Sequence, residues 1–379
     1  MKIIPDFNIR GFMLTAAFFA GLGFGISAFA LEHAYLIDLN SKTATELDTL
    51  GGNDSDASGI NDAGQIAGFS NTAGGAYHAF ITGHDGMGTR DLGTLGDGSY
   101  ASDINDAGQV AGWFSTADGT YASHAFITGP NGMGMRDLGT LSGTDSRAFA
   151  INNAAQVAGV FGTPEVASHA FITGPNGMGM RNLGTLGGNG SYAAGINDAG
   201  QVVGSSTTAE GTSRAFITGP NGMGMRDLGT LGGTYSQAFG INDAGQVVGF
   251  SHTTGAAAHA FITGPNGMGM RDLGTLGGTG YYDLSYAFSI NDAGQVVGFS
   301  NTATGDSHAF ITGPNGAGMT DLNSLIDLPN GVILTSASGI NNIGQVIAQA
   351  AIIPEPETSA LLLAGLTVIG LMAQRKKTL

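Results

Sequence analysis

Residues 169–205 read HAFITGPNGMGMRNLGTLGGNGSYAAGINDAGQVVGS, and they contain four short apolar runs separated by turn signals. The first run, 169–173, ends at Gly-Pro-Asn-Gly, where proline fixes the backbone of a turn and Asn-Gly closes it. A second run follows at about 178–183, and a glycine-rich break separates it from a third at 191–197. Asp-Ala-Gly then forms a tight hairpin that leads to a fourth run at 201–205. The stretch predicts four antiparallel strands joined in chain order.

This stretch is one of seven copies that run from about His33 to Ala348. Each copy begins with a His-Ala-Phe-like triplet and ends with an Ile-Asn turn followed by Gln-Val or Gln-Ile. The turn isoleucines, spaced 44 to 50 residues apart, are Ile60, Ile104, Ile151, Ile196, Ile241, Ile290 and Ile340. Four strands in ~45 residues match the blade of a β-propeller, whereas a β-solenoid coil has a shorter period and parallel strands.

Seven copies of a blade predict a closed ring. A single meander leaves its faces unburied and an open row leaves sheet ends exposed, and closure removes both problems. We therefore predict an all-β fold, a seven-bladed β-propeller of four-stranded antiparallel blades in which each copy forms one blade. An N-terminal signal helix and a C-terminal hydrophobic helix would flank it. The predicted domains are a signal peptide at 1–30, the repeats at 31–352 and a tail at 353–379.

The N-terminal segment has the pattern of a secretory signal peptide. Lys2 and Arg10 precede an apolar run at 12–24, and Ala28 and Ala30 supply the small residues that signal peptidase accepts. Cleavage is expected directly after the second of these alanines. A membrane anchor is the alternative, but the run is shorter than the ~20 residues that a spanning helix needs.

The C-terminal segment combines a proline motif, an apolar stretch and a basic stop. In chain order these are Pro354, Glu355 and Pro356, then 360–373, then Arg375, Lys376 and Lys377. The apolar stretch predicts a transmembrane helix that spans only with bilayer thinning, with the basic residues on the cytoplasmic side. Such a tail would tether an exported protein to the membrane with its repeats outside.

These last residues resemble the PEP-CTERM sorting signal of Gram-negative bacteria that make exopolysaccharide. The resemblance rests on the order of Pro-Glu-Pro, helix and basic cluster, and it covers only the segment from 353 onward. It implies that an exosortase acts at the Pro-Glu-Pro site, after signal peptidase has acted at the other end. The protein would be exported from a Gram-negative bacterium, tethered to the membrane before processing, and then found at the cell surface or outside the cell. A simple tail anchor is the alternative.

The repeated text is similar to the HAF family of extracellular repeats. The shared runs are His-Ala-Phe, Asp-Leu-Gly-Thr-Leu-Gly-Gly and Ile-Asn-Asp-Ala-Gly-Gln-Val-Val-Gly, and they cover nearly all of the mature chain. This resemblance implies an extracellular location and a repeat architecture, and it implies no particular reaction. The sequence departs from the pattern at Arg214, which replaces the histidine, and at Ala155, which replaces the turn glycine.

Charge and cysteine content exclude several classes of partner. Residues 31–353 carry eight Lys and Arg against 26 Asp and Glu, a net charge of −18. So acidic a surface disfavours nucleic acid, whose phosphates need neutralising Lys and Arg. Cysteine is absent, so no disulfide and no thiolate metal site can form. We expect no cofactor and no bound metal.

The repeated polar residues are expected to be structural, because an active site needs one asymmetric constellation. We expect the triplet histidines to form hydrogen bonds and arginines such as Arg181 to link blades or strand ends. Hairpin aspartates such as Asp198 are expected to form Asx turns rather than calcium sites. The sequence has no nucleophile elbow, phosphate loop or His-Glu-x-x-His helix, and we predict no catalytic residue. The sequence does not exclude a pair of catalytic carboxylates that comes from distant blades and cleaves glycosidic bonds.

Two turns are nearly the same in every copy, the Pro-Asn-Gly turn and the Asn-Asp-Ala-Gly hairpin, and a meander places both at one end. The copies differ mainly in the loops at the opposite end. The candidate binding residues in these loops are Tyr100, Arg147, Tyr281, Tyr282 and Asp283. Aromatic rings stack on sugar faces and carboxylates accept hydrogen bonds from hydroxyls, so this rim is typical of a carbohydrate or protein contact surface. Trp113, the one tryptophan of the sequence, is expected in the core.

Two functions remain after these exclusions. The first is an exported cell-surface or extracellular-matrix protein, a binding or structural propeller associated with exopolysaccharide or with surface proteins. The second is a secreted propeller enzyme, a hydrolase or lyase that acts on polysaccharide. The sorting tail and the lack of a recognisable catalytic pattern favour the first.

Overall fold

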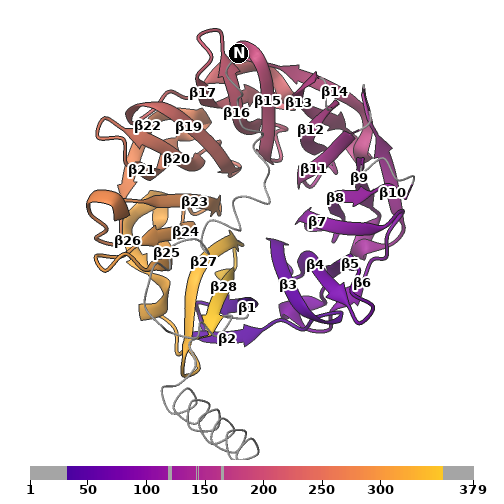
Figure 1. The fold of residues 1–379 in the computed structure, drawn as a ribbon, viewed down its shortest axis with the longest axis horizontal. Coiled ribbons are helices and arrows are strands. Elements are labelled where there is room, and N and C mark those ends of the chain that lie inside the picture. The colour runs from indigo at the N-terminus through magenta and orange to yellow at the C-terminus, as the bar shows by residue number, and fades with distance from the viewer. Residues whose placement is uncertain (1–31, 118–121, 142, 144, 164–165, 353–379) are drawn as a thin grey trace, which may run out of the picture. The chain divides into compact units, whose positions relative to one another are not determined.

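The computed structural model describes residues 32–117, 122–141, 143, 145–163 and 166–352. In this part the chain forms seven four-stranded sheets, arranged as blades around a central channel (Figure 1). One strand of each blade lies nearest the axis, namely β3, β7, β11, β15, β19, β23 and β27 (Figure 1). The fold is therefore the predicted all-β, seven-bladed β-propeller of antiparallel blades. The predicted signal helix and C-terminal helix lie outside the described residues.

Six blades take their strands in chain order from the axis outward. Blade 1 contains β3 (Gly51–Ile60), β4 (Ile66–Thr72), β5 (Tyr77–Ile81) and β6 (Arg90–Asp91). Blade 2 contains β7 (Gly98–Ile104), β8 (Val110–Ser115), β9 (Ser123–Thr128) and β10 (Met135–Gly139). Blade 3 contains β11 (Asp145–Ile151), β12 (Val157–Thr163), β13 (Val166–Gly174) and β14 (Met178–Gly184).

The next three blades repeat this order. Blade 4 contains β15 (Gly187–Ile196), β16 (Val202–Thr208), β17 (Ser213–Gly219) and β18 (Met223–Asp227). Blade 5 contains β19 (Gly232–Ile241), β20 (Val247–Thr253), β21 (Ala258–Gly264) and β22 (Met268–Gly274). Blade 6 contains β23 (Ser285–Ile290), β24 (Val296–Asn301), β25 (Ser307–Gly313) and β26 (Ala317–Asp321).

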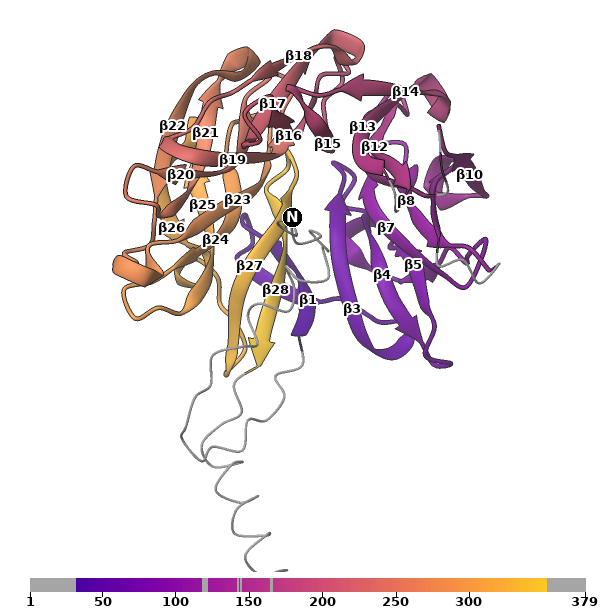
Figure 2. The same cartoon turned by 45° about the horizontal axis from the view of Figure 1, so that its top comes forward.

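Blade 7 combines strands from both ends of the repeat region (Figure 2). Its inner strands are β27 (Val332–Ile340) and β28 (Gln345–Ile352), and its outer strands are β1 (Glu32–Asp38) and β2 (Thr43–Glu46). β1 pairs antiparallel with β28, from Glu32 opposite Ala351 to Asp38 opposite Gln345. Backbone hydrogen bonds between the first and last strands thus close the ring.

This closure corrects the predicted blade boundaries. The copy at 169–205 gives β13 and β14 to the outer half of blade 3, and β15 and β16 to the inner half of blade 4. Each copy therefore spans two blades, and the prediction of one copy per blade was wrong. The strand positions themselves agree with the prediction to within a few residues.

Short 3-10 turns follow the third strand of each of the first six blades. They are η2 (His84–Gly86), η3 (Pro130–Gly132), η4 (Pro175–Gly177), η5 (Pro220–Gly222), η6 (Pro265–Gly267) and η8 (Pro314–Gly316). Two more, η7 (Gly280–Tyr282) and η9 (Leu322–Ser324), lie between blades. In η4, Asn176 has φ 55° and Gly177 has φ 66°, the left-handed region that asparagine and glycine adopt most readily.

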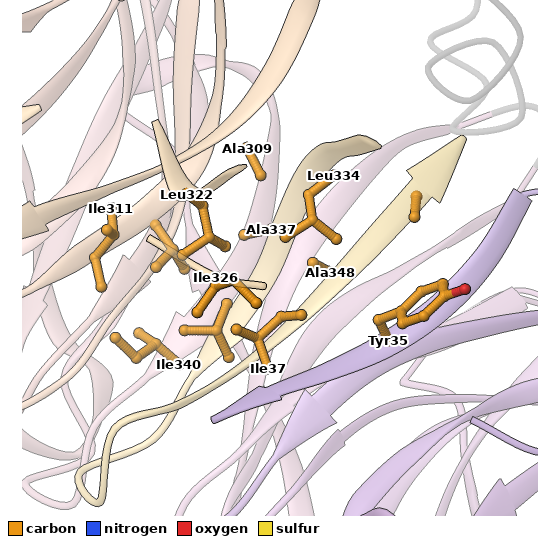
Figure 3. Close-up of a cluster of buried hydrophobic side chains, with 13 residues drawn as sticks. Tyr35, Ile37, Ala309, Ile311, Leu322, Ile326, Leu334, Ala337, Ile340 and Ala348 are labelled. Atoms are coloured by element: carbon orange, nitrogen blue, oxygen red, sulfur yellow. The ribbon is translucent and has the colours of Figure 1, made fainter. Parts of the chain in front are cut away.

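The hydrophobic core lies between neighbouring blades. Six phenylalanines of the His-Ala-Phe-like triplets are completely buried, namely Phe80, Phe126, Phe171, Phe216, Phe261 and Phe310. Burial of one such side chain stabilises the fold by roughly 1.5–3 kcal/mol. At the closure, Ile311 of blade 6 shares a cluster with Leu334 and Ile340 of β27 and Ile37 of β1 (Figure 3). The two ends of the repeat region are therefore held together by side-chain packing as well as by strand pairing.

Each innermost strand contains a β-bulge two residues before its turn isoleucine. The register shifts between Ala101 and Asp103 in β7, so Ser102 has no partner in the ladder, and the other six inner strands show the same shift. On the facing strand, a Cβ at Gly112 would lie 2.0 Å from the Tyr100 carbonyl oxygen, which only glycine avoids. Bulges redirect side chains, and here they turn one residue per blade toward the channel.

Two rings of hydrogen bonds join the inner hairpins. In the first ring, each buried asparagine donates from Nδ2 to the carbonyl oxygen of the next asparagine at 2.9–3.2 Å, in the order Asn61, Asn105, Asn152, Asn197, Asn242, Asn291, Asn341 and back to Asn61. In the second ring, the following residue donates its backbone N–H to the side chain of its counterpart, in the order Asp62, Asp106, Asn153, Asp198, Asp243, Asp292, Asn342 and back to Asp62. Both rings are complete, so all seven blades are linked at the same level.

Candidate binding surface and channel

The predicted processing residues lie outside the described part of the chain. They are Ala28, Ala30, Pro354, Glu355, Pro356, Arg375, Lys376 and Lys377. Within the described residues, no helix is long and apolar enough to cross a bilayer. The transmembrane helix expected at 360–373 stays a prediction.

The two constant turns of each copy lie together at one end of the propeller, as predicted. Gly132 N in the Pro-Asn-Gly turn donates to Gly108 O in the Asp-Ala-Gly hairpin at 2.8 Å, and Gly222 N donates to Gly200 O at the same distance. We call this end the constant face. The second-to-third strand loops and the connections between blades reach the opposite end, which we call the variable face.

Tyr281, Tyr282 and Asp283 form one exposed turn on the variable face, between β22 and β23. The Tyr281 side chain is 84% exposed and that of Tyr282 is 48% exposed, and their rings meet edge to face at 5.7 Å. Asp283 Oδ1 lies 2.9 Å from His259 Nε2, which anchors the turn to blade 5. The Tyr282 ring also packs against the loop at Gly305, where an added Cβ would lie 3.0 Å from it.

Tyr100 and Arg147 lie elsewhere, in β7 of blade 2 and β11 of blade 3, so their predicted place in loops was wrong. Both contact Trp113 of β8. The Tyr100 ring stacks on Trp113 at 4.1 Å, and the Arg147 guanidinium lies 4.6 Å from the Trp113 ring centre. Tyr77 continues the stack 6.0 Å from Tyr100, and its hydroxyl donates to Asp54 Oδ2 at 2.7 Å. Hydrogen bonding to this carboxylate raises the pKa of Tyr77 to about 12.

The five predicted rim residues therefore divide between two places rather than forming one site. Trp113 is partly exposed, so its expected place in the core was wrong. Its ring lies between Tyr100 and Arg147, which leaves its edges rather than its faces for a ligand. We call Tyr77, Tyr100, Trp113 and Arg147 the aromatic stack.

The triplet histidines form hydrogen bonds, as expected. In five copies Nδ1 contacts an acidic side chain thirteen residues later, in the pairs His33–Glu46, His78–Asp91, His124–Asp137, His259–Asp272 and His308–Asp321. Burial lowers the pKa of His259, but hydrogen bonds and charge from Asp272 and Asp283 raise it more, so the net shift is upward. These pairs tie the third strand of a blade to the fourth.

The repeated arginines link neighbouring blades, as expected. Arg181 Nη2 donates to the carbonyl oxygen of Asn221 at 2.6 Å, and Arg90, Arg136, Arg226 and Arg271 make the same contact with the Pro-Asn-Gly turn of the following blade. Each contact satisfies a carbonyl that the strand ladder leaves open.

The hairpin aspartates do not form the Asx turns that we expected. In each hairpin the preceding asparagine makes the local contact instead, as where Asn197 Oδ1 accepts from Gln201 N at 2.9 Å. Asp198 instead accepts from the backbone N–H of Asn153 in the neighbouring blade at 2.8 Å. Burial raises the pKa of Asp243, and the charges of Asp198, Asp292 and Asp106 add to this effect. Among the described residues, no group of three or more His, Asp or Glu is placed to hold a metal ion.

A cavity in the channel contains the residues that the bulges turn inward. It measures about 180 Å³, and its wall includes Ser58, Ser102, Phe149, Ala194, Phe239, Phe288 and Ser338, one from each blade. Asp103 lies beside Ser102 in this wall, and protein surrounds it although it keeps partial exposure to the channel. Burial raises the pKa of Asp103 to about 7, despite hydrogen bonds from the Ile151 and Ile104 backbones that lower it.

Sequence reasoning missed this cavity, although the sequence carries a signal for it. Aligned on the turn isoleucine, the copies have Ser, Ser, Phe, Ala, Phe, Phe and Ser two residues earlier. That position varies in the middle of the most constant part of the repeat. The prediction compared only the loops, so variation inside a strand was overlooked.

Comparison with known proteins gives the fold. No protein-family model matches the chain, and no curated protein sequence matches it. A prolyl endopeptidase structure matches with a TM-score of 0.53 at 9% identity, over 74% of this chain and 44% of that one. Oligogalacturonate lyase in complex with manganese matches with a TM-score of 0.50 at 10% identity, over 86% of this chain and 98% of that one. A putative TolB from Agrobacterium tumefaciens gives 0.48 at 10% identity, over 85% and 98%. At these identities the chain is similar to β-propellers in fold alone.

Proposed function

We propose that the protein is an exported cell-surface or matrix propeller that binds polysaccharide through its variable face. One observation carries the proposal: Tyr281 and Tyr282 present exposed rings on a turn fixed by the contact between Asp283 and His259. Aromatic rings exposed on a rigid support lose little conformational entropy on binding and stack well on sugar faces. The signal pattern and the PEP-CTERM-like tail support export and an association with exopolysaccharide.

The aromatic stack would serve as a second, more polar contact on the same face. The faces of the Trp113 ring are taken up by Tyr100 and Arg147, so the stack offers the edge of the Trp113 ring and the Tyr77 hydroxyl oxygen. Such groups form hydrogen bonds with sugar hydroxyls or carboxylates rather than stacking on them. Stacking is therefore assigned to the tyrosine turn.

The test is binding of the purified full chain to a glycan array. Replacement of Tyr281 and Tyr282 by Ala should weaken binding of the recognised glycan by roughly 1 kcal/mol or more per lost stacking contact. Since both side chains are exposed, the unfolding temperature should change little. Met178→Ala is the matched control, because Met178 is 65% exposed, between the values for Tyr282 and Tyr281, but lies in a turn of the constant face.

Two results would contradict the proposal. Full glycan binding by the double variant, together with a loss in Met178→Ala, would assign binding to the constant face. Release of reducing sugar from a bound glycan would instead identify a hydrolase or lyase. A pair of acids whose replacement abolishes that release would then mark the active site.

A further inference from the structure

Serines lie on one side of the channel wall, which we call the polar side, and phenylalanines lie on the other. At the bulge position, Ser338, Ser58 and Ser102 come from the consecutive blades 7, 1 and 2. Phe149, Phe239 and Phe288 come from blades 3, 5 and 6, and Phe239 contacts Phe288 edge to face at 5.4 Å. The backbone around the cavity thus repeats seven times, whereas the side chains that line it differ from blade to blade.

A carboxylate is fixed on the polar side of this cavity. Asp103 Oδ1 accepts from Ile104 N at 2.8 Å, and Oδ2 accepts from Ile151 N of the next blade at 2.9 Å. A Cβ on Gly59 of blade 1 would lie 2.9 Å from Oδ1, so glycine there makes room for the carboxylate. Each carboxylate oxygen has a further lone pair. The two backbone contacts therefore set the orientation of Asp103 without exhausting its capacity to accept.

The electric field in the channel favours positive charge. The cavity adjoins the channel mouth on the constant face, since Ile60, Ile196, Ile241 and Ile290 line both. Five carboxylates surround that mouth, those of Asp62, Asp106, Asp198, Asp243 and Asp292. Among the residues that the structure describes, no Lys, Arg or His lines either space. A narrow opening lined by one sign of charge concentrates the oppositely charged ligand.

We propose that the channel cavity binds a small organic ammonium ion with an apolar group about the size of one ring. The ammonium would lie against Asp103 and the serine hydroxyls, and the apolar group would contact Phe239 and Phe288. Phenylalanine faces also attract cations directly. The size follows from the volume, because a cavity of ~150 Å³ accommodates benzene. This site is independent of the variable face and of its proposed glycan.

The test is calorimetric titration of the purified full chain with benzylammonium chloride at about pH 8, where most of Asp103 is ionised because its pKa is about 7. We expect a dissociation constant on the order of 1 mM or lower. Benzyl alcohol, similar in size but neutral, should bind at least about tenfold more weakly, because it lacks the charge-assisted contact. Asp103→Asn should weaken benzylammonium binding by about tenfold or more, whereas Asp306→Asn, which removes a charge outside the channel, should leave it unchanged.

Variants of the opposite wall keep the proposal testable if Asp103→Asn does not fold. Phe239→Leu and Phe288→Leu should each weaken benzylammonium binding about threefold or more. The proposal is overturned if benzylammonium does not bind, or if benzyl alcohol binds as tightly. It is also overturned if Asp243→Asn at the mouth abolishes binding while Asp103→Asn does not, because the cation would then lie at the mouth.

Discussion

At the residue scale, one buried asparagine per blade carries much of the connection between blades. Asn197 Oδ1 accepts from Gln201 N, and its Nδ2 donates both to Gln201 Oε1 at 2.9 Å and to Asn242 O of the next blade at 3.1 Å. Only an amide side chain of this length both accepts and donates here. This is the physical reason that Ile-Asn recurs in all seven copies, and the sequence predicted a structural role for the repeated residues.

Replacement of Asn197 by Asp should therefore be strongly destabilising. It would set a carboxylate oxygen against two carbonyl-type oxygens at a site that is 4% exposed. One carboxylate oxygen would keep the donor Gln201 N, but the other would face acceptors alone. A buried charge that is only partly satisfied costs more than a lost hydrogen bond, so we expect a loss of about 3 kcal/mol or more in the free energy of unfolding. Urea denaturation of the full chain measures this.

The matched control is Asn182→Asp, the same chemical change at an exposed position. It would restore the acidic partner that most other copies have, and His169 Nδ1 is buried without a partner in this structure. We expect no loss of stability and a small gain. Equal denaturation midpoints for the Asn197 and Asn182 variants would show that the asparagine ring contributes little.

At the element scale, the sequence predicted which segments form strands but not which strands share a blade. Periodic apolar runs and turn residues give the strands, because both signals are local. A cyclic repeat has no intrinsic first strand, so the blade boundary depends on a contact between the two chain ends. One indication was present: the first copy begins with the His-Ala-Phe-like strand β1, and the last ends with the hairpin β27 and β28. Each is half of a blade.

The site could be predicted only where the copies visibly differ. Tyr281 and Tyr282 interrupt a constant run, so the sequence identified them. The separation of these two tyrosines from Tyr100 and Arg147 could not be predicted from the sequence, because it depends on where each blade lies around the ring. The copies also differ at the position of Ser102 and Phe239, but the direction in which these side chains point depends on bulges, which the residue pattern alone does not reveal.

The closing strands give the element-scale prediction. Deletion of residues 32–46 removes β1 and β2, and it exposes the edge of β28 and the cluster around Ile37. An exposed edge strand pairs with other chains, so the shortened protein should lose its single unfolding transition and associate in size-exclusion chromatography. A synthetic peptide of residues 32–46, added in trans, should restore the monomer and the transition. A peptide with Ile37→Asp should not, and monomeric behaviour without any peptide would contradict closure by β1.

At the whole-molecule scale, seven similar blades carry a few groups of side chains that occur only once in the described structure. Turns, buried phenylalanines and two hydrogen-bond rings repeat in nearly every blade, and these repeats hold a molecule without disulfides. The unrepeated features are the tyrosine turn, the aromatic stack and the two-sided channel wall. The tyrosine turn lies in a loop, the channel residues lie at bulges, and the aromatic stack consists of side chains on regular strands. All three can therefore vary without disturbing the backbone ladder within each blade.

Ring closure predicts that the number of copies matters more than in an open array. Deletion of residues 169–213, one period of the repeat, joins Ser168 to Arg214 and keeps strand order, so β11 and β12 would pair with β17 and β18. The shortened chain has six blades, and each interface must pack at a wider angle while Asn152 bonds to Asn242 instead of Asn197. In an open stack, removal of one repeat removes only the stability of that repeat and of one interface between repeats. Here every interface changes, so thermal unfolding should begin far lower and extend over a broader range. Calorimetry of the deletion variant beside the full chain measures this, and an unchanged melting temperature and width would contradict a ring whose seven interfaces depend on one another.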